Sequence, residues 1–298
     1  MSADLDSKWT VLSSKSGHDP RLPPLTVASG PVTGTRSDGP SDPDSWASVP
    51  HRFRASTDPL PPPWSDYFEP LRAGSVDDLM VVGQIGQSLD GRIATEKGRS
   101  HYINGIAGRA HLHRLRALVD AVIVGVGTAI ADDPRLTVRL VAGPHPARVV
   151  VDPSGRLPRN ARLLAEDSVR RLVLTTGAGG RTWPADVEVL SLPAVDGRIA
   201  PAAILASLAE QGLRRLLVEG GADTISGFLT AGCLDRLHIV VAPIILGAGR
   251  TGLAMPPVEH PHEAPRVKMR VYPLDDEVLL DCDLSARRLP IGVAKKSM

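Results

Sequence analysis

The protein is poor in cysteine, in net charge and in long apolar runs. Its 298 residues include only two cysteines, Cys233 and Cys282. Two thiols can build neither a disulfide framework nor a four-thiolate zinc site, so a reducing, cytoplasmic setting is expected. Lys and Arg number 34 and Asp and Glu 33. This balance argues against a broad basic surface for nucleic acid or for an anionic membrane.

Long hydrophobic segments are also missing. The best apolar run, Leu237–Gly249, is interrupted by His238 and Pro243, and a membrane span needs about 20 apolar residues. The first ten residues contain no apolar stretch, which argues against a secretory signal. Hydrophobic residues still make up 42% of the chain, enough for the core of a globular protein.

Composition changes sharply near residue 75. Proline, Ser, Gly and Asp dominate before it, and proline removes amide donors and disrupts helices. We therefore expect an N-terminal extension over residues 1–75, disordered over 1–45, and a folded domain over 76–298. Aromatic residues make up only 3% of the chain, yet several gather in the second part of the extension. This clustering favours an arm that packs on the domain, the alternative being a linker with no fixed seat. The aromatic residues are Trp46, Phe53, Trp64, Tyr67 and Phe68.

After residue 76, short apolar runs alternate with helical patterns. Such alternation predicts an α/β fold, with a mostly parallel central sheet, helices on both of its faces and antiparallel strands at the C-terminus. Asn104 is the expected N-cap of the first long helix. Helices are expected at Gly105–Val119, Ala200–Gln211 and Thr224–Leu229. Strands are expected at Met80–Ile85, Ala121–Val124, Arg148–Val151, Arg171–Leu174, Val187–Leu190, Arg215–Val218, Leu237–Ala242, Val267–Tyr272 and Val278–Leu284.

In such sheets the site lies beyond the carboxyl ends of the strands. Glu219-Gly220-Gly221 follows one strand, and Ala222-Asp223-Thr224 then opens a helix. Two glycines allow a close backbone approach, and the free amides of a helix N-terminus attract anions. The segment predicts a phosphate cradle with Glu219 beside it, the alternative being a tight turn that needs glycine.

Three further strand ends carry polar residues. Gly125-Val126-Gly127-Thr128 begins like a dinucleotide fingerprint, although Ile130 replaces its third glycine. Val151-Asp152-Pro153-Ser154-Gly155-Arg156 could hold a ribose or a 2′-phosphate. Asp90-Gly91 predicts a turn after the first strand, and Ser100-His101-Tyr102, which follows Gly98-Arg99, is interpreted as a lid or a substrate loop.

No metal site is expected. His111 and His113 are two residues apart on a predicted helix, so they point to different sides. His260 and His262 lie in a proline-rich loop, and no serine stands in a G-x-S-x-G elbow.

Taken together, these segments resemble the reductase domain of riboflavin biosynthesis, a pyrimidine reductase with a dihydrofolate-reductase-like fold. The resemblance covers roughly residues 78–285. The residues that carry it are Gln87-Ser88-Leu89-Asp90-Gly91-Arg92-Ile93-Ala94, Gly125-Val126-Gly127-Thr128, Asp132-Asp133-Pro134-Arg135-Leu136-Thr137-Val138-Arg139, Val151-Asp152-Pro153-Ser154-Gly155-Arg156, Val218-Glu219-Gly220-Gly221, and Ala242-Pro243 followed by Leu246-Gly247.

The resemblance implies an NADPH-dependent reductase that converts the ribosyl group of a 5-amino-6-(5-phosphoribosylamino)uracil-type substrate into ribityl, by hydride transfer to C1′. It also implies a homodimer. Glu219 or Asp132 is the candidate for proton delivery. The residues implied at the cofactor are Gly86, Thr128, Asp132, Val151, Asp152, Ser154, Gly220, Gly221, Ala222 and Thr224, and those implied at the substrate are Ser100, Tyr102, Leu136, Arg135, Arg139 and Glu219.

Several questions stay open from the residues alone. The H-x-E and P-C-x-x-C ligands of a zinc deaminase are absent, so the substrate either keeps its amino group or is deaminated by another protein. The choice of NADPH over NADH is not fixed. Two alternatives are a reductase of the same fold acting on another pterin or pyrimidine, and a non-catalytic nucleotide-binding module.

Overall fold

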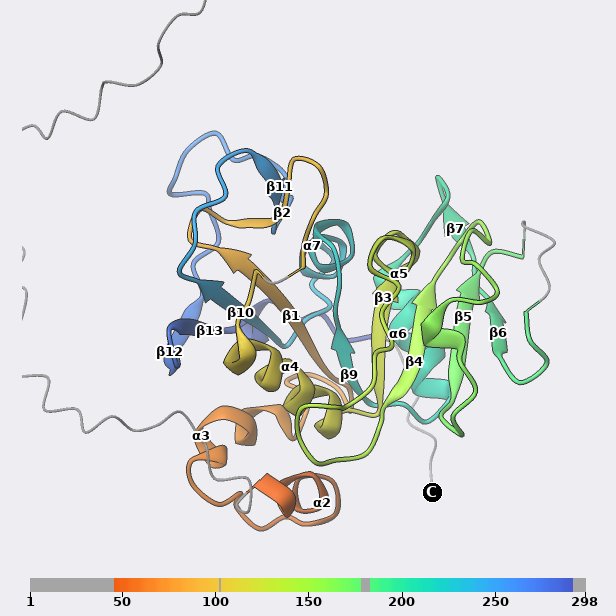
Figure 1. Cartoon of the computed structure of the whole chain (residues 1–298), viewed down its shortest axis with the longest axis horizontal. Coiled ribbons are helices and arrows are strands. Elements are labelled where there is room, and N and C mark those ends of the chain that lie inside the picture. Colours follow the sequence, from red (N-terminus) through yellow and green to blue (C-terminus); the bar gives the residue numbers. More distant parts are fainter. Residues whose placement is uncertain (1–45, 102, 178–182, 292–298) are drawn as a thin grey trace, which may run out of the picture. The chain divides into compact units, whose positions relative to one another are not determined.

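A nine-stranded sheet organises the part of the chain that the computed structural model describes, residues 46–101, 103–177 and 183–291. Its strand order is β12-β13-β10-β1-β9-β3-β4-β5-β6 (Figure 1). Neighbouring strands are parallel from β10 to β6, whereas β13 and β12 are antiparallel to their neighbours. The strands are β1 (Met80–Ser88), β3 (Ala121–Gly125), β4 (Ala147–Val151), β5 (Arg171–Thr175), β6 (Glu188–Ser191), β9 (Arg215–Val218), β10 (Arg236–Ala242), β12 (Lys268–Leu274) and β13 (Glu277–Asp283).

Helices cover both faces of this sheet, as the sequence predicts. Successive side chains of a strand point to opposite faces, so Val122 and Ile123 of β3 enter different cores. The first core lies under α4 (Ile106–Leu118) and α5 (Val126–Asp132), and the second under α6 (Pro201–Glu210) and α7 (Ala222–Thr230). Two small ribbons pair β2 (Arg92–Thr95) with β11 (Gly249–Thr251), and β7 (Ala194–Val195) with β8 (Arg198–Ile199). Within the described ranges, none of the helices has the length and apolar character that a bilayer span requires.

The aromatic arm belongs to the first core. It forms α2 (Val49–Ala55), α3 (Trp64–Phe68) and the short 3-10 helix η1 (Glu69–Leu71), drawn in orange below the sheet in Figure 1. Trp46 and Trp64 are buried, and the guanidinium group of Arg114 in α4 lies 4.7 Å from the ring centre of Trp64. The indole of Trp46 donates a hydrogen bond to the Ala142 carbonyl at 2.7 Å. The expected packing of the arm is therefore confirmed.

The change in composition near residue 75 does not separate the arm from the sheet domain. Phe53 and Phe68 of the arm share the first core with Leu115 and Val122 of the sheet domain, and all described residues belong to one compact unit. The change in composition thus marks no folding boundary in the described part of the chain. Residues 1–45, where we expect disorder, lie outside the described residues.

The start of α4 differs from the expectation. Gly105 is the N-cap of this helix, and Asn104 is not. Asn104 instead donates through its amide side chain to the Glu277 carboxylate at 2.8 Å and to the Val240 carbonyl at 3.2 Å. Glu277 of β13 accepts the amide of Gly108 at 2.8 Å. The Glu277 carboxylate, from a strand distant in sequence, therefore caps the first turn of α4. No residue near the start of this helix indicates that contact.

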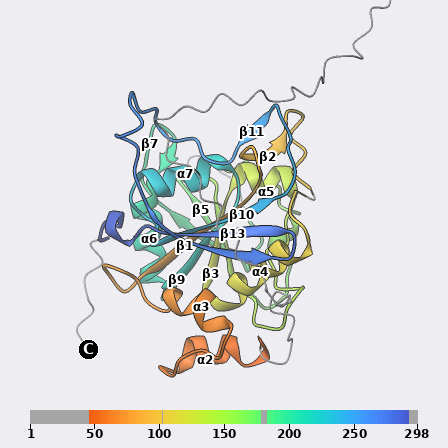
Figure 2. The ribbon, with the colours of Figure 1, turned by 90° about the vertical axis from the view of Figure 1, so that its left-hand side faces the viewer.

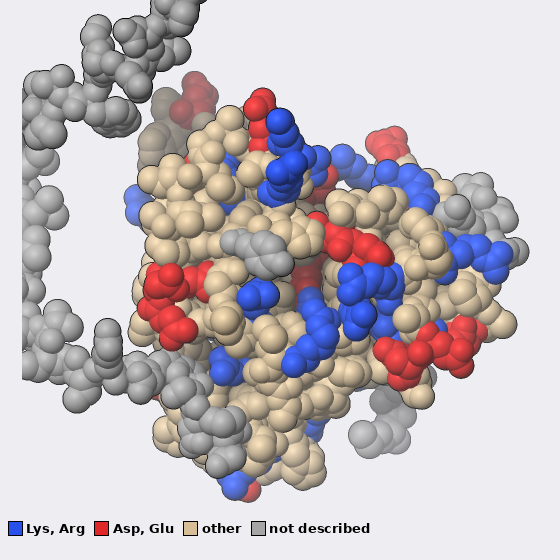
Figure 3. Space-filling view, viewed as in Figure 1, with Lys and Arg blue, Asp and Glu red and all other residues tan. Residues whose placement is uncertain are grey.

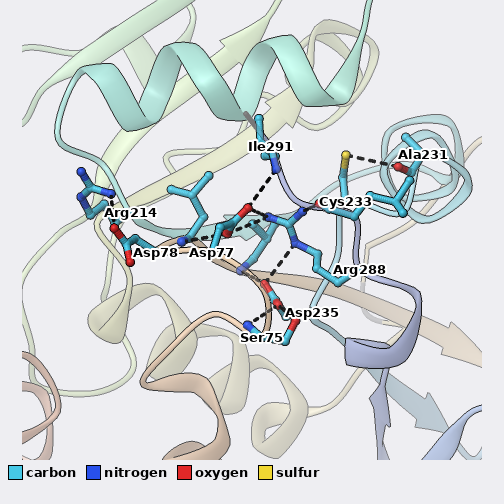
Figure 4. A network of polar contacts seen from close by, with 12 residues as sticks. Ser75, Asp77, Asp78, Arg214, Ala231, Cys233, Asp235, Arg288 and Ile291 are labelled. Atoms are coloured by element: carbon cyan, nitrogen blue, oxygen red, sulfur yellow. Dashed lines mark hydrogen bonds and ion pairs between the residues drawn. The ribbon is translucent and has the colours of Figure 1, made fainter. Parts of the chain in front are cut away.

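A buried polar network closes the end of the sheet where β1 begins (Figure 4). The Arg288 guanidinium, fully inaccessible to solvent, lies between Asp77 and Asp235. Asp235 also accepts the backbone amides of Ser75 at 2.9 Å and Val81 at 2.8 Å. Through these contacts the segment that contains Arg288 is held against the residues that precede β1, so the network stabilises the fold.

Candidate active site

Two neighbouring strands end side by side at the opposite end of the sheet. Ile123 of β3 pairs with Val218 of β9, and a helix starts almost directly after each strand. Gly125 is the N-cap of α5 and Gly221 that of α7, and neither helix has a side-chain cap. The first amides of such helices have no partner within the helix. The two turns therefore place the first amides of both helices together at the carboxyl ends of these strands.

Glycine is required here by the closeness of the two turns. Gly220 has a φ of +118°, and a Cβ on it would lie 3.1 Å from the Thr128 hydroxyl oxygen. A Cβ on Gly125 would lie 2.4 Å from the Thr224 hydroxyl oxygen. The amide of Gly221 donates to the Thr128 hydroxyl at 2.8 Å. The structure thus brings together Thr128, Thr224 and the segment Gly220-Gly221-Ala222, which are five of the residues implied at the cofactor. A glycine backbone at the start of a helix suits an anion such as a pyrophosphate.

The remaining residues implied at the cofactor are placed differently. Val151 pairs with Gly125 at the end of β4, close to the cradle, and Ser154 is exposed on the loop that follows. The Asp152 carboxylate is fully buried and accepts the amides of Arg156 and Leu157 at 2.9 and 2.8 Å, so it shapes this loop. Gly86 makes room for Asn104, whose side-chain oxygen would lie 1.7 Å from a Cβ at this position.

Glu219 is buried beside the cradle and is paired with a residue that sequence reasoning missed. Its two carboxylate oxygens accept from Nε and Nη2 of Arg116 at 2.7 and 2.6 Å. Both side chains are 7% exposed. Arg116 stands in the last turn of α4, where an arginine ordinarily faces solvent, and 103 residues separate it from Glu219. No local pattern could have indicated this pair.

The loop after α5 extends the site. The Thr137 carbonyl accepts from Nη1 of Arg116 at 3.1 Å, and the Thr137 hydroxyl accepts from Nη1 of Arg139 at 2.7 Å. Leu136 is buried with a φ of +55°. Burial, followed by the guanidinium charges of Arg116, Arg135 and Arg162, lowers the pKa of Arg139. The candidates Leu136, Arg139 and Glu219 therefore lie close together, and Arg135 lines a pocket with Arg139.

A second contact joins two other candidates. The Ser100 hydroxyl donates to the Asp132 carboxylate at 3.0 Å, which brings the loop before α4 to the end of α5. Both residues are half-buried. Tyr102, implied at the substrate, lies outside the described residues. Figure 3 shows basic side chains gathered near the middle of this face, beside acidic ones.

The two histidines of α4 point to different sides, as their spacing predicts. His111 contacts His238 at 3.0 Å between Nε2 and Nδ1. His113 accepts the amide of Arg139 at 2.7 Å through Nδ1, and burial lowers its pKa to about 3. Within the described part of the chain, no group of three or more His, Cys, Asp or Glu side chains could hold a metal ion.

The fold and the site together define an α/β protein in which two glycine-containing strand–helix turns lie beside a group of arginine side chains. The RibD C-terminal domain model matches residues 79–271. The chain therefore belongs to the RibD C-terminal domain family.

Curated relatives agree with this assignment. The 2,5-diamino-6-ribosylamino-4(3H)-pyrimidinone 5′-phosphate reductase of Archaeoglobus fulgidus is 37% identical over 179 residues, 56% of this chain and 81% of that protein. The protein of the same name from Methanothermobacter thermautotrophicus is 32% identical over 67% of this chain and 96% of its own length. RibD of Aquifex aeolicus is 36% identical over 55% of this chain. The chain matches only 46% of that RibD protein, about half of its length.

Solved structures agree as well. The deaminase/5-amino-6-(5-phosphoribosylamino)uracil reductase of Thermotoga maritima superposes with a TM-score of 0.61 and 31% identity, over 69% of this chain and 56% of that one. Rib7 of Saccharomyces cerevisiae, at 21% identity and a TM-score of 0.56, shows the shared fold over 70% of this chain and 90% of its own. The predicted fold class and the predicted enzyme class, a riboflavin-pathway reductase, are both confirmed.

Proposed function

We propose that the protein is an NADPH-dependent reductase that converts the ribosyl group of a phosphoribosylaminopyrimidine into a ribityl group. The observation that carries this proposal is the buried ion pair between Arg116 and Glu219, which lies between the Gly220-Gly221 cradle and the Thr137–Arg139 loop. A buried charge pair at the edge of a nucleotide cradle is well suited to fix a polar substrate against a cofactor.

Each part of the site has a role in this proposal. The amides at the start of α7 and the Thr128 hydroxyl would hold the pyrophosphate of the cofactor, which supplies a hydride when bound. Both oxygens of Glu219 are engaged by Arg116. A carboxylate held in this way accepts hydrogen bonds and orients hydroxyl or amino groups of the substrate.

Asp132 is the better candidate for handling a proton. One of its oxygens accepts from the Ser100 hydroxyl at 3.0 Å, and the residue lies at the end of α5, which starts at the cradle. Reduction of an imine at C1′ adds a hydride to carbon and a proton to nitrogen. In this proposal Asp132 takes up a proton from solvent and transfers it to the imine nitrogen, while the Ser100 hydroxyl orients its carboxyl group.

We also propose that the protein forms a homodimer through the β12 edge of the sheet. Met269 and Val271 of β12 are 52% and 57% exposed, and Val278 of β13 is 37% exposed. Val271 pairs with Leu280, and Val278 with Pro273, so these apolar side chains share one face. Figure 2 shows this edge turned toward the viewer. Uncovered apolar faces of this kind are typical of subunit interfaces.

We further propose that the protein works in the cytoplasm. Cys233 and Cys282 are both free and buried, which suits a reducing cytoplasm.

The deciding experiment measures NADPH and NADH consumption by the purified protein. The 2,5-diamino and the deaminated 5-amino ribosylaminopyrimidine phosphates are offered separately, and the product is examined for a ribityl chain by mass. Turnover with NADPH is expected, and the preferred pyrimidine sets the order of reduction and deamination. Tight NADPH binding without oxidation by either substrate would contradict the proposal and favour another pterin or pyrimidine, or a binding role.

A further inference from the structure

The arm of residues 46–71 contacts the two elements that carry arginines of the candidate site. In Figure 1 the arm lies directly below α4. Helix α4 carries Arg116 in its last turn, and the loop after α5 carries Arg139. The arm itself lies outside residues 79–271, which the family model matches. Its role therefore does not follow from the family to which the chain belongs.

The first contact is made by Arg54 of α2 at the C-terminal end of α4. Its Nη2 donates to the Ala117 carbonyl at 3.3 Å and also to the Val119 carbonyl. The last carbonyls of a helix have no partner within the helix, and a cation at this end also interacts favourably with the helix dipole. Arg54 precedes Ala117 by 63 residues. The arm therefore supplies a cap for the last turn of α4.

The same guanidinium group extends this contact to β9. Nη1 of Arg54 lies 3.5 Å from the carboxylate of Asp120, the residue between α4 and β3. Asp120 also accepts the backbone amide and Nη2 of Arg215, both at 2.8 Å. Arg215 begins β9, and Glu219 follows directly after this strand. The elements that carry Arg116 and Glu219 thus meet at Arg54 through one shared carboxylate.

A second contact holds the loop after α5 against the arm. The indole of Trp46 donates to the Ala142 carbonyl of this loop at 2.7 Å. The next residue, Gly143, lies between α4 and α2. A Cβ on Gly143 would be 2.6 Å from the Cβ of Ala117 and 3.5 Å from Cγ of Pro50. The loop therefore packs closely against α4 and the arm together.

These contacts lie next to the bonds that shape the candidate site. Arg116 immediately precedes Ala117, and its Nη1 donates to the Thr137 carbonyl at 3.1 Å. The amide of Arg139 donates to Nδ1 of His113 in α4 at 2.7 Å. An arginine side chain is long, so the place of its guanidinium group depends on the backbone that carries it. A displacement of about 1 Å at such a group can lower a reaction rate about 100-fold.

We propose that Arg54 is a positioning residue of the enzyme, which fixes the last turn of α4 so that Arg116 meets Glu219 and Thr137 in the geometry that the pyrimidine substrate requires. This inference rests on the proposed function. Arg54 acts on the substrate side of the site, because its contacts lie where β9 begins, whereas Gly220-Gly221 follows the end of β9. Loss of Arg54 should therefore weaken the use of the pyrimidine and leave NADPH binding intact.

The test compares two variants of the full chain. Arg54→Ala removes the cap of α4, and Arg52→Ala removes an exposed arginine of the same helix α2. Each substitution deletes one positive charge, so the pair separates position from charge. We expect Arg54→Ala to lower kcat/KM for the pyrimidine about 10- to 100-fold through a raised KM, with the KM for NADPH unchanged. Arg52→Ala should keep both values.

This split distinguishes positioning from a loss of stability. A protein that is merely less stable has a smaller active fraction, which lowers the apparent kcat and leaves the KM for the pyrimidine unchanged. An unchanged KM for the pyrimidine in Arg54→Ala would therefore overturn the inference and leave the proposed function standing.

Chemical rescue supplies an independent measurement. Methylguanidinium added to Arg54→Ala can occupy the place of the missing guanidinium group, and we expect it to restore part of the lost kcat/KM. It should not raise kcat/KM in the wild type or in Arg52→Ala. Guanidinium ions in general weaken folded proteins, so a gain confined to Arg54→Ala cannot come from added stability.

Hydrogen exchange followed by mass spectrometry requires no turnover. Arg54→Ala should speed amide exchange in the last turn of α4, where the Val119 amide donates to the Leu115 carbonyl, and leave exchange in α7 unchanged. This pattern in a protein that oxidises NADPH with no pyrimidine would support the action of Arg54 on α4 and refute the proposed reaction. Unchanged exchange in α4 would overturn the inference.

Discussion

The guanidinium group of Arg116 holds both carboxylate oxygens of Glu219, at 2.7 and 2.6 Å, in a part of the site with little access to solvent. The pair connects α4 with the end of β9, so the position of the helix and the geometry of the site depend on each other. The chain also offers an exposed counterpart with the same geometry, formed by Arg170 and Glu188.

These two pairs allow a matched comparison of burial. Glu219→Gln leaves the Arg116 charge buried without compensation, so we expect the free energy of unfolding to fall by about 3 kcal/mol. We also expect kcat/KM to fall about 100-fold, as when one preorganised polar group of an active site is lost. Urea titration and initial rates provide the measurements.

Glu188→Gln is the control, because it breaks an exposed pair whose side chains are 40% and 39% accessible. It should change stability by less than about 1 kcal/mol and leave turnover intact. An equal fall of kcat/KM in the two variants would show that Glu219 is not part of the active site.

The cradle predicts a specific loss of cofactor affinity. Gly220→Ala places a Cβ 3.1 Å from the Thr128 hydroxyl at a φ of +118°. The substitution should therefore displace the backbone that faces the pyrophosphate. We expect the Kd for NADPH, followed by its fluorescence, to rise about 10-fold or more. Gly212→Ala also has a positive φ, but nothing lies within 4 Å of the added Cβ, so it should leave NADPH binding unchanged.

Stability should fall as the pH falls below neutrality. Burial lowers the pKa of His113 to about 3, and it lowers the pKa of His111 as well, so the folded state binds fewer protons than the unfolded one. The stabilising contribution of each neutral imidazole is present above the unfolded pKa of about 6.5 and is lost progressively at lower pH. For His113 this loss extends to about pH 3.

The variant His113→Asn keeps an acceptor for the Arg139 amide and cannot titrate. Its Tm should therefore fall less than that of the wild type between pH 7.5 and pH 5, with His111 accounting for the remaining slope. His51→Asn alters an exposed histidine and should retain the full slope. A wild-type Tm that does not change between pH 7.5 and pH 5 would refute the lowered pKa values of His113 and His111.

The arm predicts different effects for two truncations. A chain beginning at residue 45 should keep its Tm within a few degrees, because it retains Trp46 and Trp64. A chain beginning at Ser75 loses both indoles and uncovers Arg114 and Leu115 of α4. It should be strongly destabilised, since removing one buried Trp or Phe side chain costs about 3–5 kcal/mol. Differential scanning calorimetry of both chains tests this, and equal Tm values would show that the arm is dispensable.

The dimer proposal predicts the effect of charge at the sheet edge. Val271→Lys puts an ammonium group into the apolar face of β12, so we expect a dimer to dissociate into monomers in multi-angle light scattering. Val195→Lys changes a 76% exposed residue on the separate β7–β8 ribbon and should leave the mass unchanged. A monomeric wild type would contradict the proposal directly.

The sequence by itself determined the nine strands of the large sheet and the helices α4, α6 and α7, but it did not indicate α5, which carries Thr128 and Asp132. Apolar runs such as Ala121–Val124 and Arg215–Val218 are buried on both faces in any parallel sheet, so their identity follows from local composition. Gly220-Gly221 is informative for the same local reason, because a positive φ and a close approach both require glycine. The arm could be predicted to pack because its aromatic residues stand out in a chain with few of them.

Only the tertiary structure decided which charges meet. Arg116 and Glu219 are 103 residues apart, and an arginine in an amphipathic helix carries no sign of its partner. Asn104 was predicted to cap α4, but the Glu277 carboxylate accepts the Gly108 amide of that helix instead. Glu277 lies on a strand 173 residues further along the chain than Asn104. Arg139, Arg148 and Arg162 line the same pocket. They come from the loop after α5, from β4 and from the 3-10 helix η2 (Arg162–Leu164), which are separate in sequence. Contacts of this kind depend on how the chain crosses over the sheet, and no local pattern of residues encodes that path.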